Sequence, residues 1–333
     1  MRPTSLGMAL ALCFISAPGF AQGPVTTAAT TAPSFAPLTL QEALTRAAQA
    51  NPSLRAKKAQ LAAAEGVNTD ARALLFNNPQ LSLENTQRQI PQPGTGEDTR
   101  REWAAGLSQT FEIGGQGRHR RESAGAALAA LRLEIADTER QVRSDISSRF
   151  YKVLALQQRA DLEAEALKLF DAAASAVQKR RQAGEDTKLD ANVAAVEAER
   201  ARNQMAQIQE QLDEARSDLA ARLQLDAVAL PQAQGDLAPV ATGYALNDLL
   251  NGLQSQPRLL ALSEREKSAN ARLRLEKASV LPDLTVGLNT GREGPADARE
   301  RLTTLTVSLP LPLFKRNAAG IGQAASDAAQ AQI

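Results

Sequence analysis

The amino-acid sequence predicts a mainly α-helical protein with a smaller β part and an internal duplication. Residues 94–230 contain no proline, and apolar side chains recur in this segment at steps of three and four. Four shorter segments alternate apolar and polar residues, as strands with two different faces do. Three short motifs also recur in the same order roughly 200 residues later, which indicates duplication of one large unit.

The first 21 residues are typical of a secretory signal peptide. Arg2 precedes an apolar run over residues 6–15, and Gly19 and Ala21 are the small residues before the expected cleavage point. The only cysteine, Cys13, would be removed with this segment. Residues 22–37 are rich in Thr, Ala and Pro and predict a flexible leader. No later segment approaches twenty uninterrupted apolar residues, so any membrane crossing has to use strands.

Composition argues against several classes of function. The chain has 38 basic and 37 acidic residues, and it lacks the basic block that nucleic-acid binding requires. One histidine, His119, and one cysteine do not suffice for a protein-built zinc or iron–sulfur site. We therefore expect no catalytic, cofactor-binding or metal-binding residues, no cofactor, and no enzyme activity.

Two helices are expected at the start of the first unit. Thr39 is a plausible N-cap for a helix that ends near Ala50. Asn51-Pro52 interrupts it and starts a second helix, because proline fits the first helical turn. That second helix is expected to run to about Phe76.

A β-hairpin follows over residues 79–113. Leu81 and Leu83 alternate with polar residues, and the second run alternates from Trp103 to Ile113. The polar segment 89–101 is expected to be the connecting loop. Each run has about ten residues, the length of a tilted strand that crosses a bilayer. Alternation alone is equally compatible with a hairpin that lies on a soluble core.

Residues 118–224 predict a pair of long antiparallel helices. A helix of about 65 residues at 1.5 Å per residue would be roughly 100 Å long, too long for a compact domain. The turn falls at residues 183–186, where Gly184 can adopt a left-handed conformation, and Asp186 or Thr187 would cap the returning helix. At the start of this segment, His119 and its arginine neighbours, Arg118, Arg120 and Arg121, either contact anionic lipid headgroups or are simply solvated.

The duplication divides the chain into units 38–235 and 236–333. Residues 51–56 recur at 256–261, residues 79–83 at 282–286, and residues 106–108 at 306–308. The second unit therefore has its own β-hairpin at 282–313. It stops just inside the equivalent of the long helix, about 90 residues short of a full copy by this period. We expect the chain to be truncated at its C-terminus.

Several of these motifs resemble the TolC family of outer-membrane efflux factors, over essentially all of residues 38–333. The resemblance rests on residues 40–44 with Asn51-Pro52, on residues 107–115, which end in Glu112-Ile113-Gly114-Gly115, and on residues 308–314, which end in Pro310-Leu311-Pro312-Leu313-Phe314. The last two motifs are similar to the CzcC-like, cobalt–zinc–cadmium branch.

The resemblance implies a homotrimer in the outer membrane. Four strands from each protomer would complete a twelve-stranded transmembrane barrel, and the long helices would continue as a periplasmic tunnel. The implied function is a passive export duct in a tripartite efflux system of the RND type, with heavy-metal cations as a candidate cargo. Its implied partners are a periplasmic membrane-fusion adaptor, an inner-membrane RND pump and outer-membrane lipid. Acidic gating residues would lie beyond Ile333.

The same resemblance suggests two sets of functional residues. The adaptor would dock at the tip of the long hairpin, at Arg181, Gly184, Thr187, Leu189 and Asp190. The strand residues expected to face the membrane are Leu81, Leu83, Trp103, Leu107, Phe111, Leu284, Val286, Leu288, Leu305, Val307 and Leu309. Two alternatives stay open at this point, a non-functional truncated remnant of such a factor and a periplasmic adaptor-like coiled-coil protein.

Overall fold

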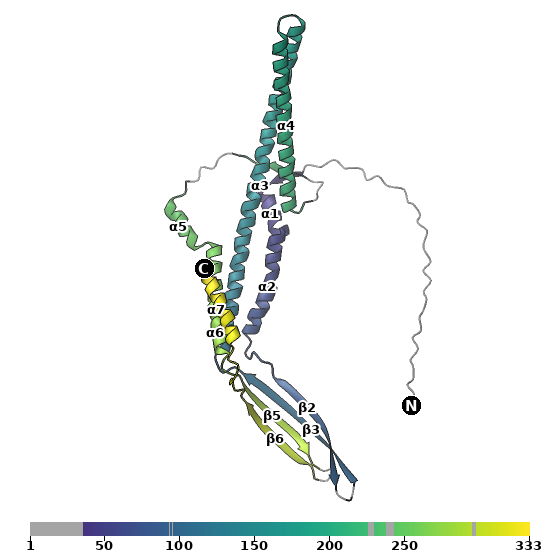
Figure 1. Cartoon of the computed structure of the whole chain (residues 1–333), viewed down its shortest axis with the longest axis vertical. Coiled ribbons are helices and arrows are strands. Elements are labelled where there is room, and N and C mark those ends of the chain that lie inside the picture. The colour runs from purple at the N-terminus through teal and green to yellow at the C-terminus, as the bar shows by residue number, and fades with distance from the viewer. Residues whose placement is uncertain (1–35, 93, 95, 226–229, 238–242, 295–297) are drawn as a thin grey trace, which may run out of the picture.

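A computed structural model describes residues 36–92, 94, 96–225, 230–237, 243–294 and 298–333. The expected signal peptide and almost all of the expected leader lie outside these residues. The described chain is elongated, with a helical hairpin at one end, a four-stranded sheet at the other and further helices between them (Figure 1).

The elements follow one another twice in the same order, helices first and then a β-hairpin and a further helix. In chain order they are β1 (Ala36–Thr39), α1 (Leu40–Ala50), α2 (Pro52–Ala71), β2 (Gln80–Gln92), β3 (Gly96–Phe111), α3 (Gln116–Gln182), α4 (Lys188–Arg222), β4 (Pro231–Gln234), α5 (Leu246–Gln254), α6 (Pro257–Ala278), β5 (Leu284–Glu293), β6 (Glu300–Ser308) and α7 (Ala318–Gln332).

Capping residues define the first two helices. Thr39 and Glu42 form a capping box at the start of α1, which confirms the predicted N-cap. The Asn51 side chain accepts hydrogen bonds from the backbone of Ser53 and Leu54 and so caps α2. The predicted end of α2 at Phe76 is wrong. The backbone N–H of Arg72 bonds to the carbonyl three residues before it, so the last turn tightens and the chain turns toward the sheet.

The long hairpin is confirmed. Helix α3 has 67 residues, about 100 Å at 1.5 Å per residue, and α4 returns along its distal part. Gly184 has a φ of +81°, as the tight turn requires. The remainder of α3 packs against α2 and α6, so this one helix contacts both halves of the chain.

A hydrophobic core lies where α1, α3, α4 and β4 meet. Phe150 and Ile146 of α3 and Ile208 and Leu219 of α4 are almost fully buried there. The sequence did not predict the small parallel sheet of β1 and β4 beside this core, and β1 begins inside the range expected to be the leader. The Gln157 side chain of α3 binds both the N–H and the C=O of Ala233, at 2.9 and 3.1 Å, and so fixes β4.

The second sheet is antiparallel with the order β2-β3-β5-β6. Pairing of β3 with β5 joins the hairpin of the first half to that of the second. The expected loop over residues 89–101 is wrong, because both strands continue through it to a turn around Gly94. Residues 84–89 and 99–102 are all polar, so alternation gives no sign of a strand. As a result Trp103 lies in the middle of β3 and not at its start.

The duplication is visible in the backbone. Helices α3 and α7 both follow a residue in the left-handed conformation, Gly115 and Asn317. These two residues lie 202 positions apart, slightly more than the offset of 200 that the motif at residues 106–108 predicted. Among the residues that the structure describes, none of the helices is both long and apolar enough to span a bilayer.

Candidate functional surfaces

The strand residues predicted to face the membrane share one face of the second sheet. Residues opposite each other in a ladder point to the same side, and Leu81 lies opposite Leu107, which lies opposite Leu288. The same register continues from Leu288 to Leu305. The other predicted residues within the strands also lie on this face, because each is either paired with a residue of the face or two positions along the strand from one. Leu309 lies outside the strands and directly follows β6.

This apolar face is not covered by the rest of the described chain. Leu81 is 71% exposed, Leu107 56% and Leu305 68%. The sheet projects away from the helices, and no helix of the described residues lies along it (Figure 1). The alternative of a hairpin resting on a soluble core therefore does not describe this structure.

The opposite face of the same sheet is polar and built from small residues. Thr110 and Thr285 share a hydrogen bond of 2.8 Å between their hydroxyl groups. A Cβ at Gly106 would lie 1.8 Å from the Asn289 side-chain oxygen, so the Asn289 side chain packs directly over this glycine and would have to move for a larger residue. Glu102 is buried on this face and pairs with Arg88 at 3.2 Å. The sheet thus separates a hydroxyl- and amide-lined surface from an apolar one.

The two outer strands, β2 and β6, each pair with only one strand among the described residues. Their free edges expose unpaired N–H and C=O groups, which makes them ready to pair with another chain.

A polar junction holds the sheet against the helices. The Arg120 guanidinium binds Glu112 through two hydrogen bonds, one of them 3.0 Å long, and lies 3.4 Å from the centre of the Phe76 ring. The Gln116 amide donates to the Leu281 carbonyl at 3.1 Å and to Asp283 at 3.3 Å. Sequence reasoning missed this junction, because its members come from four separate segments.

The other basic residues predicted near this junction lie beside it. Arg118 and Arg121 are exposed, and His119 lies 3.4 Å from Glu122. Within the described ranges, no group of three or more His, Cys, Asp or Glu side chains is arranged to hold a metal ion.

The structure brings all five predicted docking residues together at the far end of the helical hairpin. Thr187, not Asp186, caps α4, and it exchanges hydrogen bonds with Asp190. The hydrogen bonds from Thr187 lower the pKa of Asp190. Leu189 is 70% exposed, and Asp186 binds Arg180 at 2.6 Å. Of the five, Thr187 and Asp190 shape the turn, while Leu189 offers an apolar side chain to the outside.

An ionic cluster joins α2, α3 and α6 in the middle of the molecule. Glu134 of α3 binds Lys57 of α2 at 2.5 Å and also binds Arg265 of α6. Burial alone would raise the pKa of Glu134, but the hydrogen bonds from Arg265 and Lys57 outweigh burial and lower it. This cluster connects the two halves of the chain.

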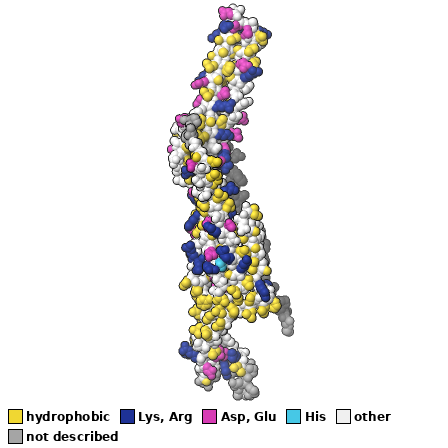
Figure 2. All heavy atoms as spheres, turned by 90° about the vertical axis from the view of Figure 1, so that its left-hand side faces the viewer, with side chains coloured by type: hydrophobic (Ala, Val, Ile, Leu, Met, Phe, Trp, Pro, Cys, Tyr) yellow, Lys and Arg dark blue, Asp and Glu magenta, His cyan; other side chains and the backbone are white. Residues whose placement is uncertain are grey.

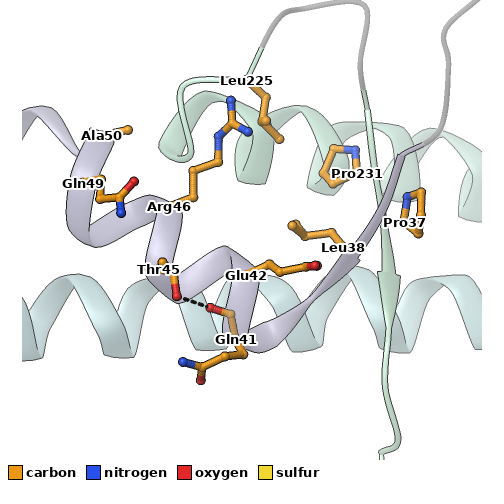
Figure 3. A pocket seen from close by; sticks show the side chains of 10 residues that line it. All are labelled: Pro37, Leu38, Gln41, Glu42, Thr45, Arg46, Gln49, Ala50, Leu225 and Pro231. Atoms are coloured by element: carbon orange, nitrogen blue, oxygen red, sulfur yellow. Dashed lines mark hydrogen bonds between the residues drawn. The ribbon is translucent and has the colours of Figure 1, made fainter.

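An open hollow lies between α1, β1 and the segment that follows α4 (Figure 3). Its side chains are spread around the rim and do not converge on one point. Arg46 donates to the Leu223 carbonyl at 3.3 Å, and Thr45 binds the carbonyl of Gln41. The Arg46 contact ties α1 to the end of α4, the Thr45 contact lies within α1, and the two do not form a catalytic arrangement.

The amino-acid sequence is similar to a known protein family and to individual proteins of known name. The family described as "Outer membrane efflux protein" matches residues 43–223. The cobalt-zinc-cadmium resistance protein CzcC of Cupriavidus metallidurans is 28% identical over the whole chain and 78% of its own length. The pyoverdine export outer membrane protein OpmQ of Pseudomonas putida is 25% identical over 72% of this chain and 52% of its own length.

Solved structures show the same fold at lower identity. A membrane protein from Pseudomonas aeruginosa has a TM-score of 0.70 at 19% identity, over 88% of this chain and 71% of that one. The outer membrane protein VceC from Vibrio cholerae has a TM-score of 0.69 at 19% identity, over 88% of this chain and 73% of that one. CusC, described in terms of folding and transmembrane channel formation, has a TM-score of 0.67 at 19% identity, over 88% of this chain and 70% of that one.

Proposed function

This chain belongs to the outer membrane efflux protein family, and from that premise we propose how its surfaces perform export as the channel component of a tripartite efflux system. The sheet spans the outer membrane with its apolar face toward lipid and its polar face toward a water-filled lumen. The helices extend this path into the periplasm. The observation that supports the proposal is the separation of apolar and polar residues onto the two faces of one uncovered sheet.

The dimensions of the apolar face support a membrane crossing. Along β3 and the two residues that follow it, the apolar face extends from Trp103 to Ile113, which is ten residue steps. At about 3.4 Å per step and a tilt of about 40°, this gives a band roughly 26 Å tall, close to the ~25 Å band of outer-membrane proteins.

The free edges of β2 and β6 support assembly with further copies. Backbone groups cannot stay unpaired in hydrocarbon, so each edge requires a partner strand. Three copies of the four-stranded sheet would close into a twelve-stranded barrel and leave no edge. We therefore propose a homotrimer whose periplasmic helices surround the same lumen.

The tip of the hairpin would bind the periplasmic adaptor, which connects the channel to an inner-membrane pump. Leu189, Val193 and Val196 are exposed apolar residues on the first turns of α4, where a helical partner could pack. The pump would supply the energy, and this chain a passive path. The likeness to CzcC suggests heavy-metal cations as the cargo. The hydroxyl and amide groups on the polar face would bind such cations weakly, so the cations could pass through the lumen.

Membrane fractionation combined with chemical cross-linking tests the channel. We expect the protein in the outer-membrane fraction, cross-linked as a trimer. A monomer in the periplasmic fraction would contradict the proposal.

A pair of variants tests the docking tip. Leu189→Asp should weaken capture of the adaptor at least tenfold and leave outer-membrane assembly unchanged. Leu162→Asp is the matched control, because Leu162 is similarly exposed but lies on α3 well away from the tip. Equal effects of the two substitutions on capture would exclude the tip as the docking surface.

A further inference from the structure

Three neighbouring strands each carry an arginine next to a glutamate, in the pairs Arg101-Glu102, Arg292-Glu293 and Glu300-Arg301. Successive residues of a strand point to opposite faces. In all three pairs the arginine lies on the apolar face and the glutamate on the polar face, because Trp103 lies opposite Arg292 and Arg292 opposite Arg301. These three arginines thus share the apolar face, whereas Arg88, the partner of Glu102, lies on the polar face.

The arginine row is formed by Arg101, Arg292 and Arg301. All three side chains are exposed, and within the described part of the chain none of them makes an ion pair. Arg292 and Arg301 are directly opposite each other, with Cβ atoms about 5 Å apart by strand geometry, and Arg101 is the diagonal neighbour of Arg292 at roughly 7–8 Å. Like charges in direct opposition destabilise a sheet, so this row is suited to an anion that bridges its members.

The arginine row marks the border of the apolar face that is farther from the helices. On the same face, Trp103 lies directly opposite Arg292. The turn between β5 and β6 follows just beyond the row, while β2 and β3 continue to their turn around Gly94. In Figure 2 a hydrophobic band at the sheet is bounded at its far end by charged side chains. Tryptophan and arginine at such a border are typical of the membrane–water interface.

We propose that the arginine row binds the phosphate groups of phosphorylated glycolipid in the outer leaflet of the membrane. This inference rests on the proposed function, which puts the hairpin turns on the cell exterior. Each guanidinium presents a planar fork of donors that matches phosphate oxygens bidentately. Arginines from β3, β5 and β6 would together hold a lipid with two phosphates across adjacent strands.

The test measures binding of lipid A with both phosphates, and of chemically dephosphorylated lipid A, to the purified full chain in detergent by native mass spectrometry. The triple variant Arg101→Gln, Arg292→Gln and Arg301→Gln should lose at least tenfold in affinity for the phosphorylated lipid. Dephosphorylated lipid A should bind wild type and variant equally weakly. The single variant Arg292→Gln, which changes only the central member, should lose severalfold.

The matched control is the triple variant Arg72→Gln, Arg118→Gln and Arg121→Gln. These three exposed residues lie near the opposite border of the sheet, and the substitution removes the same charge. Affinity for phosphorylated lipid A should stay within twofold of wild type. An equal loss in both triple variants would overturn the proposal in favour of non-specific attraction, or of phospholipid binding at the inner border.

Membrane fractionation of the same proteins separates failure of this inference from failure of the channel. Wild type and variants in the outer membrane with unchanged lipid binding would overturn the inference alone. A wild-type chain that does not reach the outer membrane would overturn the proposed function and this inference with it.

Discussion

Glu134 connects three helices that the sequence places far apart. Its carboxylate is only 16% exposed and binds cations from α2 and α6, which belong to different halves of the chain. Its lowered pKa makes this contact dependent on pH. A carboxylate with a lowered pKa in the folded state stabilises the fold above its ordinary pKa of 4.5, and this contribution is lost as pH falls through the lowered value.

Glu134→Gln should therefore lower the free energy of unfolding by about 1–2 kcal/mol at pH 7, because two cations lose their partner in a partly buried site. The difference from wild type should shrink as the pH falls below 4.5. Thermal unfolding followed by circular dichroism at several pH values measures it. Glu139→Gln is the control, since the Lys58–Glu139 pair is about half exposed on both sides and should contribute well under 1 kcal/mol. A difference at pH 7 that persists unchanged at low pH would contradict the role of the charge.

Single residues were predictable where their role is local. Thr39 as a cap, Gly184 as a turn residue and Asn51-Pro52 as a helix break were identified from neighbours within a few positions, because caps and tight turns depend on short-range geometry. The ion pairs of Glu134 and Arg120 were not, since they form only when distant segments pack together.

At the scale of elements, β6 gives a direct comparison of the two faces of the sheet. Leu305 and Thr304 are adjacent in sequence, and they point to the apolar and the polar face respectively. Leu305→Arg should destabilise the membrane-inserted protein by about 2–4 kcal/mol, the cost of arginine on a lipid-facing position near the bilayer midplane. Thr304→Arg should cost much less, because its side chain would reach water.

The amount of heat-resistant trimer in outer membranes, compared for the two variants on semi-native gels, measures this difference. Equal losses for Leu305→Arg and Thr304→Arg would mean that both faces have the same surroundings, which contradicts the assignment of lipid and lumen.

Helix α3 also contains the largest buried side chain of the core. Phe150 is 1% exposed and packs edge-on against the Tyr151 ring with 5.7 Å between ring centres. Phe150→Ala should destabilise the α1–α3–α4 region by about 3–5 kcal/mol through loss of burial and the cavity it leaves. Limited proteolysis near residue 150 should accelerate strongly, whereas Leu162→Ala, at an exposed position, should leave the rate almost unchanged.

The boundaries of elements were harder to predict than their existence. The long helices and the apolar halves of the strands have clear periods. Residues 84–89 of β2 and 99–102 of β3 are all polar and show no alternation. Strands β1 and β4 have four residues each, too few to show a period. The end of α2 was missed because Leu74, Leu75 and Phe76 continue an apolar run although they lie exposed beyond the helix.

For the whole molecule, the duplication predicts how neighbouring copies pair. Within one chain, Leu107 of β3 lies opposite Leu288 of β5. Strand β6 repeats β3 at the offset of 202 given by Gly115 and Asn317, and β2 repeats β5 at the offset of 203 given by Pro79 and Pro282. If β6 of one copy pairs with β2 of the next in the same register in which β3 pairs with β5, Val307 of one copy lies opposite Gln87 of the next.

Cysteines introduced together at Val307 and Gln87 should therefore cross-link neighbouring copies upon oxidation in membranes, with a three-chain product on non-reducing gels. Cys13 lies in the expected signal peptide and would not interfere. Stronger cross-linking of Val307→Cys with a cysteine at Asn85 or Gln89 would contradict this register, and the absence of any linked product would contradict pairing of the two edges.

The pairing of β3 with β5 has a consequence for how the chain folds. Leu107 and Leu288 are opposite each other in space but separated by 181 positions, with the whole helical hairpin between them. Contacts across so long a loop form late, after local helices have appeared. The hairpin of α3 and α4 would thus assemble first, and the sheet would close only once the second half had been delivered. Until then the β3 edge that pairs with β5 stays unpaired and the apolar face of β2 and β3 stays exposed, so this interval is when aggregation is most favoured.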